Sequence, residues 1–173
     1  MDLQKTITSG HTFAYDALDD GFRVINGDEE FIVTQDTVHK FPYFFDLEGK
    51  NIKGFEAHHN IKLVRQDLRQ AILTFIMTAN NNQKRIKKMM DDFRALHPKR
   101  RIPHTFTEEQ LRKMNFGYRA RSLARTNKLL TKEFLDEIKA ADHETQRELL
   151  LTLPGVGPKV ADCIMAYSEL ASP

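Results

Sequence analysis

The 173-residue sequence contains one cysteine and no long apolar run. A single cysteine excludes an internal disulfide bond, and also an iron–sulfur cluster with four cysteine ligands from this chain. No apolar stretch approaches the roughly 18 residues of a membrane span, and residues 1–10 lack the basic-then-apolar pattern of a signal peptide. We therefore expect an intracellular protein of a reducing compartment that does not bind membranes.

Acidic residues are missing from one long stretch of the chain and abundant near its start. Residues 1–60 contain 5 Lys/Arg and 11 Asp/Glu, whereas residues 61–173 contain 21 and 13. The stretch 110–132 contains seven basic residues and no acidic one, namely Arg112, Lys113, Arg119, Arg121, Arg125, Lys128 and Lys132. Charge of one sign concentrated in this way favours a polyanionic partner. Each residue taken alone is equally typical of a solvated surface.

The spacing of the apolar residues changes along the chain from a β pattern to a helical pattern. Residues 1 to about 50 are expected to form a small antiparallel sheet, with candidate strands at His11–Leu18, Phe22–Ile25 and Phe31–Thr34. Asn26-Gly27-Asp28 is a strong hairpin signal between the last two strands. The sequence thus predicts an α+β fold, with an N-terminal antiparallel sheet domain at 1–62 and a mainly helical domain at 63–173.

Helical spacing begins at Gln66, where the apolar residues recur three and four positions apart. The first helix is apolar on both faces, so we expect it to be central. Thr107-Glu108-Glu109-Gln110 has the form of a capping box. The expected helices are 66–79, 84–96, 108–114, 118–130, 134–138 and 144–152, and a last helix from Pro158.

The segment Leu153–Cys163 is expected to be a turn followed by the start of the last helix. Gly155 and Gly157 suit a tight turn with positive φ, and Pro158 suits the first position of a helix. Unpaired N–H groups and the positive end of the helix dipole favour a phosphate there. The same environment favours the neutral, nucleophilic amine of Lys159, and Cys163 shares its helix face. The glycines alone are also consistent with a plain turn between two helices.

Three stretches in this order resemble the 8-oxoguanine DNA glycosylase/lyases of the helix-hairpin-helix glycosylase superfamily. They are Gln66-Asp67 with Asn80-Asn81-Asn82, then Gly117-Tyr118-Arg119-Ala120-Arg121, and then Leu153-Pro154-Gly155-Val156-Gly157 through Lys159-Val160-Ala161-Asp162-Cys163. Ser9-Gly10 before Phe13 and the Tyr43-Phe44-Phe45-Asp46 region are similar to the N-terminal domain of that family. The resemblance covers nearly the whole chain, although non-enzymatic DNA-binding proteins also use such hairpins.

The resemblance implies a base-excision-repair enzyme that removes 8-oxoguanine from duplex DNA and then nicks the strand by β-elimination. Lys159 would be the catalytic nucleophile that attacks the sugar C1′ and forms a Schiff base. Cys163 would pack against the extruded base. Gly10 would offer its carbonyl to the N7–H that 8-oxoguanine has and guanine lacks. Read without the resemblance, Cys163 is more typical of a small buried side chain.

The resemblance also implies contacts to the rest of the DNA. Asn80, Arg85 and Arg119 would hold the cytosine that is left behind, and Tyr118 would insert into the base stack. The residues alone leave open that Tyr118 belongs to the core. They also allow at most one of Arg119 and Arg121 to face a given site.

At the hairpin, Gly155 and Gly157 would contact phosphates through their backbone, and the carbonyls of residues 153–157 could hold a monovalent cation. No cofactor is implied. The expected partner is double-stranded DNA containing 8-oxoguanine opposite cytosine, bound by a monomer. The expected location is the cytoplasm of a bacterium, at the nucleoid, or the nucleus of a eukaryote.

The sequence departs from the family at its end. The family has a catalytic aspartate in a Pro-Val-Asp-type segment beyond its lysine, and this sequence ends fourteen residues after Lys159 without a counterpart. Asp162 matches a different position in the motif. We therefore expect a fragment of a longer protein. The main alternative is a DNA-binding module without catalysis. A glycosylase for adenine or alkylated bases is a third reading, against which the lysine-bearing hairpin argues.

Overall fold

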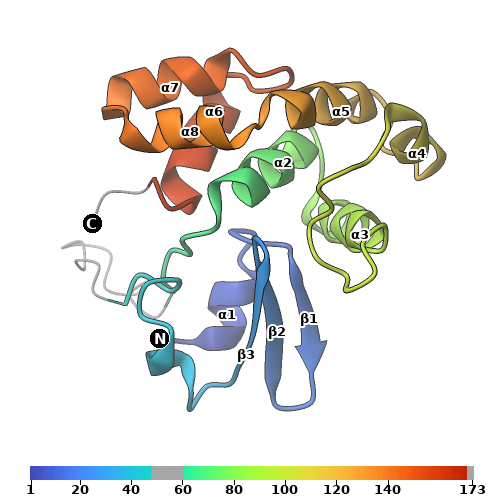
Figure 1. Cartoon of the computed structure of the whole chain (residues 1–173). Coiled ribbons are helices and arrows are strands. Elements are labelled where there is room, and N and C mark those ends of the chain that lie inside the picture. The colour runs from blue at the N-terminus through green and yellow to red at the C-terminus, as the bar shows by residue number, and fades with distance from the viewer. Residues whose placement is uncertain (48–60, 171–173) are drawn as a thin grey trace.

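The computed structural model describes residues 1–47 and 61–170. These residues form the predicted α+β fold, with a three-stranded antiparallel sheet near the N-terminus and mostly helices after it (Figure 1). The first elements are α1 (Leu3–Thr8), β1 (Tyr15–Leu18), β2 (Gly21–Asn26), β3 (Glu29–Val33) and the 3-10 helix η1 (Val38–Lys40). The later helices are α2 (Leu68–Thr78), α3 (Gln83–Arg94), α4 (Glu108–Lys113), α5 (Arg119–Leu129), α6 (Lys132–Ala140), α7 (His143–Leu151) and α8 (Pro158–Tyr167).

β2 is the central strand of the sheet and pairs antiparallel with β1 and with β3. The turn between β2 and β3 contains Gly27 at φ +62°, which confirms the hairpin expected at Asn26-Gly27-Asp28. The strand expected from His11 was predicted too long, because β1 begins only at Tyr15. The backbone before β1 instead lies next to the segment that precedes α2, because the Gln66 Nε2 donates to the His11 carbonyl at 2.8 Å.

A helix that the sequence analysis missed opens the chain. α1 is capped by Asp2, whose carboxylate accepts from the Lys5 N–H at 2.9 Å. Its apolar residues Leu3 and Ile7, four positions apart, pack against the β2 side chains Phe22 and Val24. The prediction of sheet alone up to residue 50 was therefore wrong at its start, and residues 48–50 lie outside the described part of the chain.

α2 is the central helix, as its apolar residues predict. Nine of its residues are buried: Leu68, Gln70, Ala71, Ile72, Leu73, Thr74, Phe75, Ile76 and Met77. Asp67 caps the helix by accepting from the Gln70 N–H at 2.8 Å. Because α2 packs against α3, α5 and α8, it connects the elements that carry the predicted site residues.

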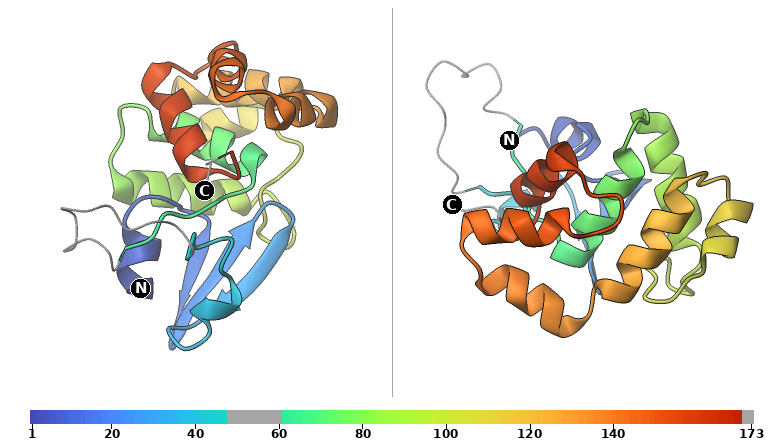
Figure 2. Two further views of the ribbon diagram at one scale, coloured as in Figure 1. Left: turned by 90° about the vertical axis from the view of Figure 1, so that its left-hand side faces the viewer. Right: turned by 90° about the horizontal axis from the view of Figure 1, so that it is seen from above.

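The sheet and the helices form two lobes in the views of Figure 1 and Figure 2, each with its own apolar cluster, and a few N-terminal residues join the cluster of the helices. Phe13, Ala14 and Ile25 of the N-terminal part belong to the apolar cluster of the helices. The fully buried Arg94 of α3 adds a polar connection, since its Nη2 lies 2.9 Å from an Asp16 carboxylate oxygen of β1. The division into domains at residues 62 and 63 stays a prediction. None of the described helices has the length and apolar character needed to cross a membrane.

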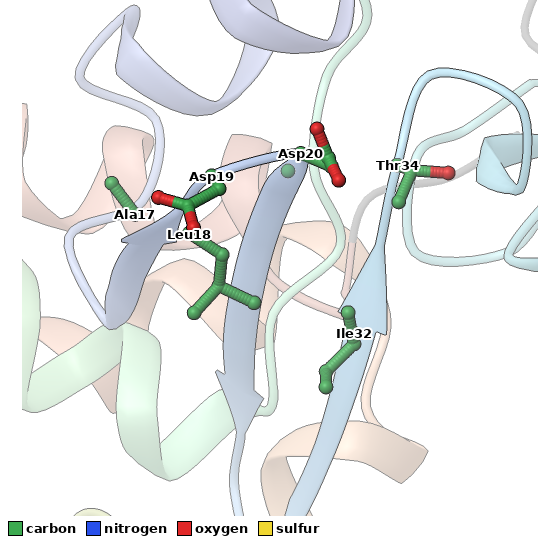
Figure 3. A pocket seen from close by; sticks show the side chains of 7 residues that line it. Ala17, Leu18, Asp19, Asp20, Ile32 and Thr34 are labelled. Carbon is green, nitrogen blue, oxygen red and sulfur yellow. The ribbon is translucent and has the colours of Figure 1, made fainter.

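An open hollow of about 460 Å³ lies on the sheet, at the end away from the hairpin between α7 and α8 (Figures 1 and 3). Leu18 and Ile32 flank it, and Asp19 and Asp20 lie at its rim in the turn between β1 and β2. None of the residues expected to carry chemistry lines this hollow. The candidate site is therefore built on the helices.

Candidate active site

The site begins with the unit α7–turn–α8, which forms as the sequence predicts. Asp142 caps α7 by accepting from the Thr145 N–H at 2.9 Å, and α8 begins at Pro158. Gly155 has φ +87°, a conformation that favours glycine. Gly157 has φ −98°, so only Gly155 uses the positive φ to which both glycines were suited. The role of Gly157 is that of N-cap residue of α8.

The turn is held against α5 and α2. A Cβ atom added at Gly155 would lie 2.7 Å from Ser122 Cβ and 3.3 Å from Ile76 Cγ2. The Thr126 Oγ1 donates to the Pro154 carbonyl at 2.8 Å. Close approach of the backbone thus requires a glycine at position 155, and the start of α8 is fixed relative to the central helix.

The turn presents unpaired backbone groups. In the described part of the chain, the N–H groups of Gly155 and Gly157 have no hydrogen-bond acceptor, and they adjoin the N-terminal end of α8. The carbonyls of Leu153, Pro154 and Gly157 each accept one hydrogen bond, which leaves each a second lone pair. Neutral carbonyls with no carboxylate among them are suitable ligands for a monovalent cation. The monovalent cation expected at the carbonyls of residues 153–157 stays a prediction.

Lys159 is exposed in the first turn of α8. Among the described residues no carboxylate lies within 4 Å of its Nζ. Asp162, one turn further along, is engaged elsewhere, because its Oδ1 lies 2.8 Å from the Arg147 Nε of α7. The amine is therefore available to a ligand.

A cavity of about 280 Å³ adjoins Lys159 and contains the three residues expected to act on the base. Lys159 and Cys163 come from α8, and Gly10 comes from the loop after α1. The full lining is Gly10, Phe13, Phe75, Thr78, Ala79, Asn80, Asn81, Gln83, Ile86, Lys159, Val160, Cys163 and Tyr167. The structure thus brings together residues from both ends of the sequence.

The loop that carries Gly10 is fixed by its neighbours. Gly10 has φ +92°, and a Cβ atom there would lie 2.6 Å from Gln83 Nε2. The same Gln83 Nε2 donates to the Ser9 carbonyl at 3.2 Å. Gln66 Nε2 donates to the carbonyls of both His11 and Tyr167, at 2.8 and 3.1 Å. One amide therefore joins the Gly10 loop to the end of α8.

Three aromatic rings beside the cavity were not expected as a group. The Tyr167 ring stacks with the His11 ring, with centroids 4.6 Å apart, and with the Phe75 ring at 5.6 Å. Tyr167 could have been found from the sequence, because it lies four residues after Cys163 on the same helix face. The stacking of His11 could not, since it depends on a contact between distant segments.

Burial shifts the pKa of three groups in or beside the cavity toward their neutral forms. It raises the pKa of the Cys163 thiol, against the opposing charge of Lys159. It also raises the pKa of the Tyr167 phenol, and it lowers the pKa of the His11 imidazole. All three groups are therefore neutral near pH 7, so the side of the cavity away from Lys159 suits a neutral, flat ligand.

A second cluster lies at the C-terminal end of α2. The Arg119 guanidinium donates to the carbonyls of Ala79 and Asn80, the latter at 2.9 Å. The Tyr118 hydroxyl donates to the same Ala79 carbonyl at 3.1 Å. Asn80 is exposed and has φ +47°. The structure therefore gathers Asn80, Tyr118 and Arg119 next to the cavity.

The exposure of the side chains decides two questions that the sequence left open, one about Tyr118 and one about Arg119 and Arg121. Tyr118 is 60% exposed, which excludes its assignment to the core. Arg119 is buried whereas Arg121 is exposed, so one of the two faces this cluster, as expected. Arg85 is exposed on α3 and donates to the Asn115 carbonyl at 3.4 Å. Arg85 does not line the cavity.

Comparisons with known proteins identify a matching motif family and related sequences. The helix-hairpin-helix motif family matches residues 138–167. The chain is 34% identical over 150 residues to the N-glycosylase/DNA lyase OGG1 of Arabidopsis thaliana, an alignment that covers 75% of this chain and 39% of that protein. It is 45% identical over 67 residues to a probable N-glycosylase/DNA lyase of Methanothermobacter thermautotrophicus, covering 38% of this chain and 22% of that protein.

The fold has a solved counterpart. The 8-oxoguanine glycosylase/lyase of Clostridium acetobutylicum, in complex with double-stranded DNA containing cytosine opposite 8-oxoguanine, superimposes with a TM-score of 0.79 at 23% identity. The superposition covers 96% of this chain and 73% of that chain. The present chain thus spans less than half the length of the two sequence relatives and nearly three quarters of the solved one.

Proposed function

We propose that the protein excises 8-oxoguanine from duplex DNA and nicks the abasic strand, because it matches the helix-hairpin-helix motif and is similar to N-glycosylase/DNA lyases. The observation that carries the proposal is the shared cavity of Gly10, Lys159 and Cys163. A base inside a duplex is out of reach of such a cavity, so it must be extruded at a cost of about a few kcal/mol. The neutral groups around the cavity suit an uncharged base.

In this proposal Lys159 is the nucleophile. Its Nζ forms a bond to C1′ as the glycosidic bond breaks, and the departing base takes up the bonding electrons and a proton. Loss of a proton and opening of the sugar ring then give the Schiff base. Removal of a proton from C2′ expels the 3′ phosphate and nicks the strand. The pairing of Asp162 with Arg147 supports this role, because it leaves the amine without a competing carboxylate.

Gly10 and Cys163 would select the base. The Gly10 carbonyl would accept a hydrogen bond from the N7–H of 8-oxoguanine, whereas guanine would present a lone pair to it. An acceptor that is left unpaired costs about 1–3 kcal/mol, which favours the oxidised base. The neutral Cys163 thiol would pack against the ring of the base.

The second cluster would stabilise the gap that the extruded base leaves in the duplex. Tyr118, exposed and oriented by its bond to Ala79, would insert into the stack in place of the extruded base. Asn80, Arg85 and Arg119 would bond the cytosine left behind. The Arg119 donors now bound to backbone carbonyls would also keep the Asn80 backbone in place.

Backbone contacts at the hairpin would anchor the DNA. The free N–H groups of Gly155 and Gly157 and the N-terminal end of α8 would bind phosphate oxygens. Arg121 and Arg125, both exposed on α5, would add cationic contacts. We propose that a monomer binds in this way, at the nucleoid of a bacterium or in a eukaryotic nucleus.

The test uses the full-length protein and two duplexes of one sequence, with either 8-oxoguanine or guanine opposite cytosine. We expect release of the base and a nick at the lesion only in the first duplex, in a salt-sensitive reaction. Binding of both duplexes without base release or nicking would reject the proposal in favour of a DNA-binding module. Release of adenine or alkylated bases instead would reject the assigned substrate.

A further inference from the structure

We propose that the hydroxyl group of Tyr167 is a specificity-determining group, which hydrogen-bonds the polar edge of the extruded base. This inference rests on the proposed function and deepens it. Tyr167 has no part in the resemblance stated from the sequence, and it is identified by its position in the cavity.

The first observation is the order of residues along α8. Lys159, Cys163 and Tyr167 follow one another at four-residue intervals and all line the cavity. With a rise of 1.5 Å per residue, Tyr167 lies about 12 Å further along the helix than Lys159. A base that extends from a C1′ next to the amine along this helix would pass Cys163 and approach Tyr167.

The second observation is that the Tyr167 ring is held by its neighbours. The ring is nearly parallel to the rings of His11 and Phe75, with interplanar angles of 20° and 21°. Its backbone is tied to the start of α2, because the Tyr167 carbonyl accepts from the Gln66 N–H at 3.1 Å. A ring constrained in this way gives its hydroxyl a fixed direction, so a hydrogen bond costs little side-chain entropy.

The third observation concerns the hydroxyl itself. Among the described residues it has no hydrogen-bond partner, whereas the Tyr118 hydroxyl and the side-chain amides of Asn81 and Gln83 have theirs. The hydroxyl oxygen is not among the buried atoms that lack a partner, so it keeps some exposed surface. Because the phenol is neutral, it can both donate and accept. A base without a matching hydrogen-bond donor or acceptor would leave the Tyr167 hydroxyl desolvated and unpaired.

The experiment compares the full-length protein with Tyr167→Phe, which removes the hydroxyl and keeps the ring in its stack. Two substrates are used under single-turnover conditions: a duplex with 8-oxoguanine opposite cytosine, and the same duplex with a preformed abasic site. Nicking at the abasic site needs Lys159 but no base. We expect excision of 8-oxoguanine to fall about 10-fold or more, as for loss of one desolvated hydrogen bond, with nicking of the abasic duplex unchanged. Tyr43→Phe, at an exposed tyrosine that does not line the cavity, is the matched control.

Unchanged excision by Tyr167→Phe would overturn the inference and leave the proposed function intact. Equal losses on both substrates would also overturn it, because they would indicate a structural role of the ring. A wild-type protein that acts on neither substrate would reject the proposed function itself, and the inference with it. Selective loss on the base-containing duplex is the only supporting result.

Discussion

Gly10 and Lys159 come from opposite ends of the sequence and line the same cavity. Gly10 lies in the loop after α1, and Lys159 lies in the first turn of α8. The amide of Gln66, at the start of α2, joins the two segments by donating to the carbonyls of His11 and Tyr167. The Gly10 loop, which would select the base, is thus linked through hydrogen bonds of Gln66 to α8, which carries Lys159.

The two hairpin glycines should respond differently to alanine. Gly155→Ala places a Cβ at positive φ and 2.7 Å from Ser122 Cβ, so we expect a loss of about 2–4 kcal/mol in the free energy of unfolding. Gly157→Ala meets no atom within 4 Å and has an ordinary φ, so its loss should stay below about 1 kcal/mol. Urea denaturation measures both. Equal losses would contradict the observed turn geometry.

Arg119 should matter more for stability than its neighbour on the same helix. Arg119→Met leaves the Asn80 carbonyl without its Arg119 donor and the Ala79 carbonyl with the Tyr118 hydroxyl alone, and we expect a loss of about 2–3 kcal/mol. Arg121→Met removes an exposed side chain and should change stability by less than about 0.5 kcal/mol. Arg119→Lys should not restore the loss, because an ammonium group lacks the planar fork that spans two acceptors. Thermal and urea denaturation of the three variants test this, and a stable Arg119→Met would refute it.

His11 should make the protein less stable in mild acid. Burial lowers the pKa of His11 below the ordinary value of 6.5, so the unfolded chain binds more protons than the folded one at a pH just below 6.5. The contribution of neutral His11 is fully present above pH 6.5 and declines as the pH falls toward the folded pKa. His11→Phe keeps a ring beside Tyr167 and removes the titration.

The measurement for His11 is the melting temperature at about pH 7.5 and pH 5.5 in wild type and variant. We expect the wild type to lose more on acidification than His11→Phe does. The difference between the two proteins isolates His11 from the other titrating groups. Identical pH dependence would show that His11 is not buried in its neutral form.

Local signals account for the parts of the fold that the sequence predicts. Pro158 marks the start of α8, and Thr107 and Gln110 form the expected capping box, with both hydrogen bonds present. These features depend on residues a few positions apart. The residues Gly10, Lys159 and Cys163 were assigned to one site through the resemblance, and the structure brings them together.

The parts that the sequence did not predict depend on distant contacts. α1 is only six residues long, and although Leu3 and Ile7 lie four positions apart, the helix depends on packing these two residues against the sheet. His11 was assigned to a strand, but its carbonyl bonds Gln66 and its ring stacks on Tyr167. The sequence suited both Gly155 and Gly157 to positive φ, although Gly157 is the N-cap residue of α8 and has an extended conformation.

The most direct test of the account is covalent trapping of the full-length protein on a duplex with 8-oxoguanine opposite cytosine, in the presence of borohydride. The account predicts one reduced protein–DNA adduct, which peptide mapping assigns to Lys159 and which Lys159→Gln does not form. An adduct assigned to another lysine, or one that persists in Lys159→Gln, would contradict the central role of Lys159.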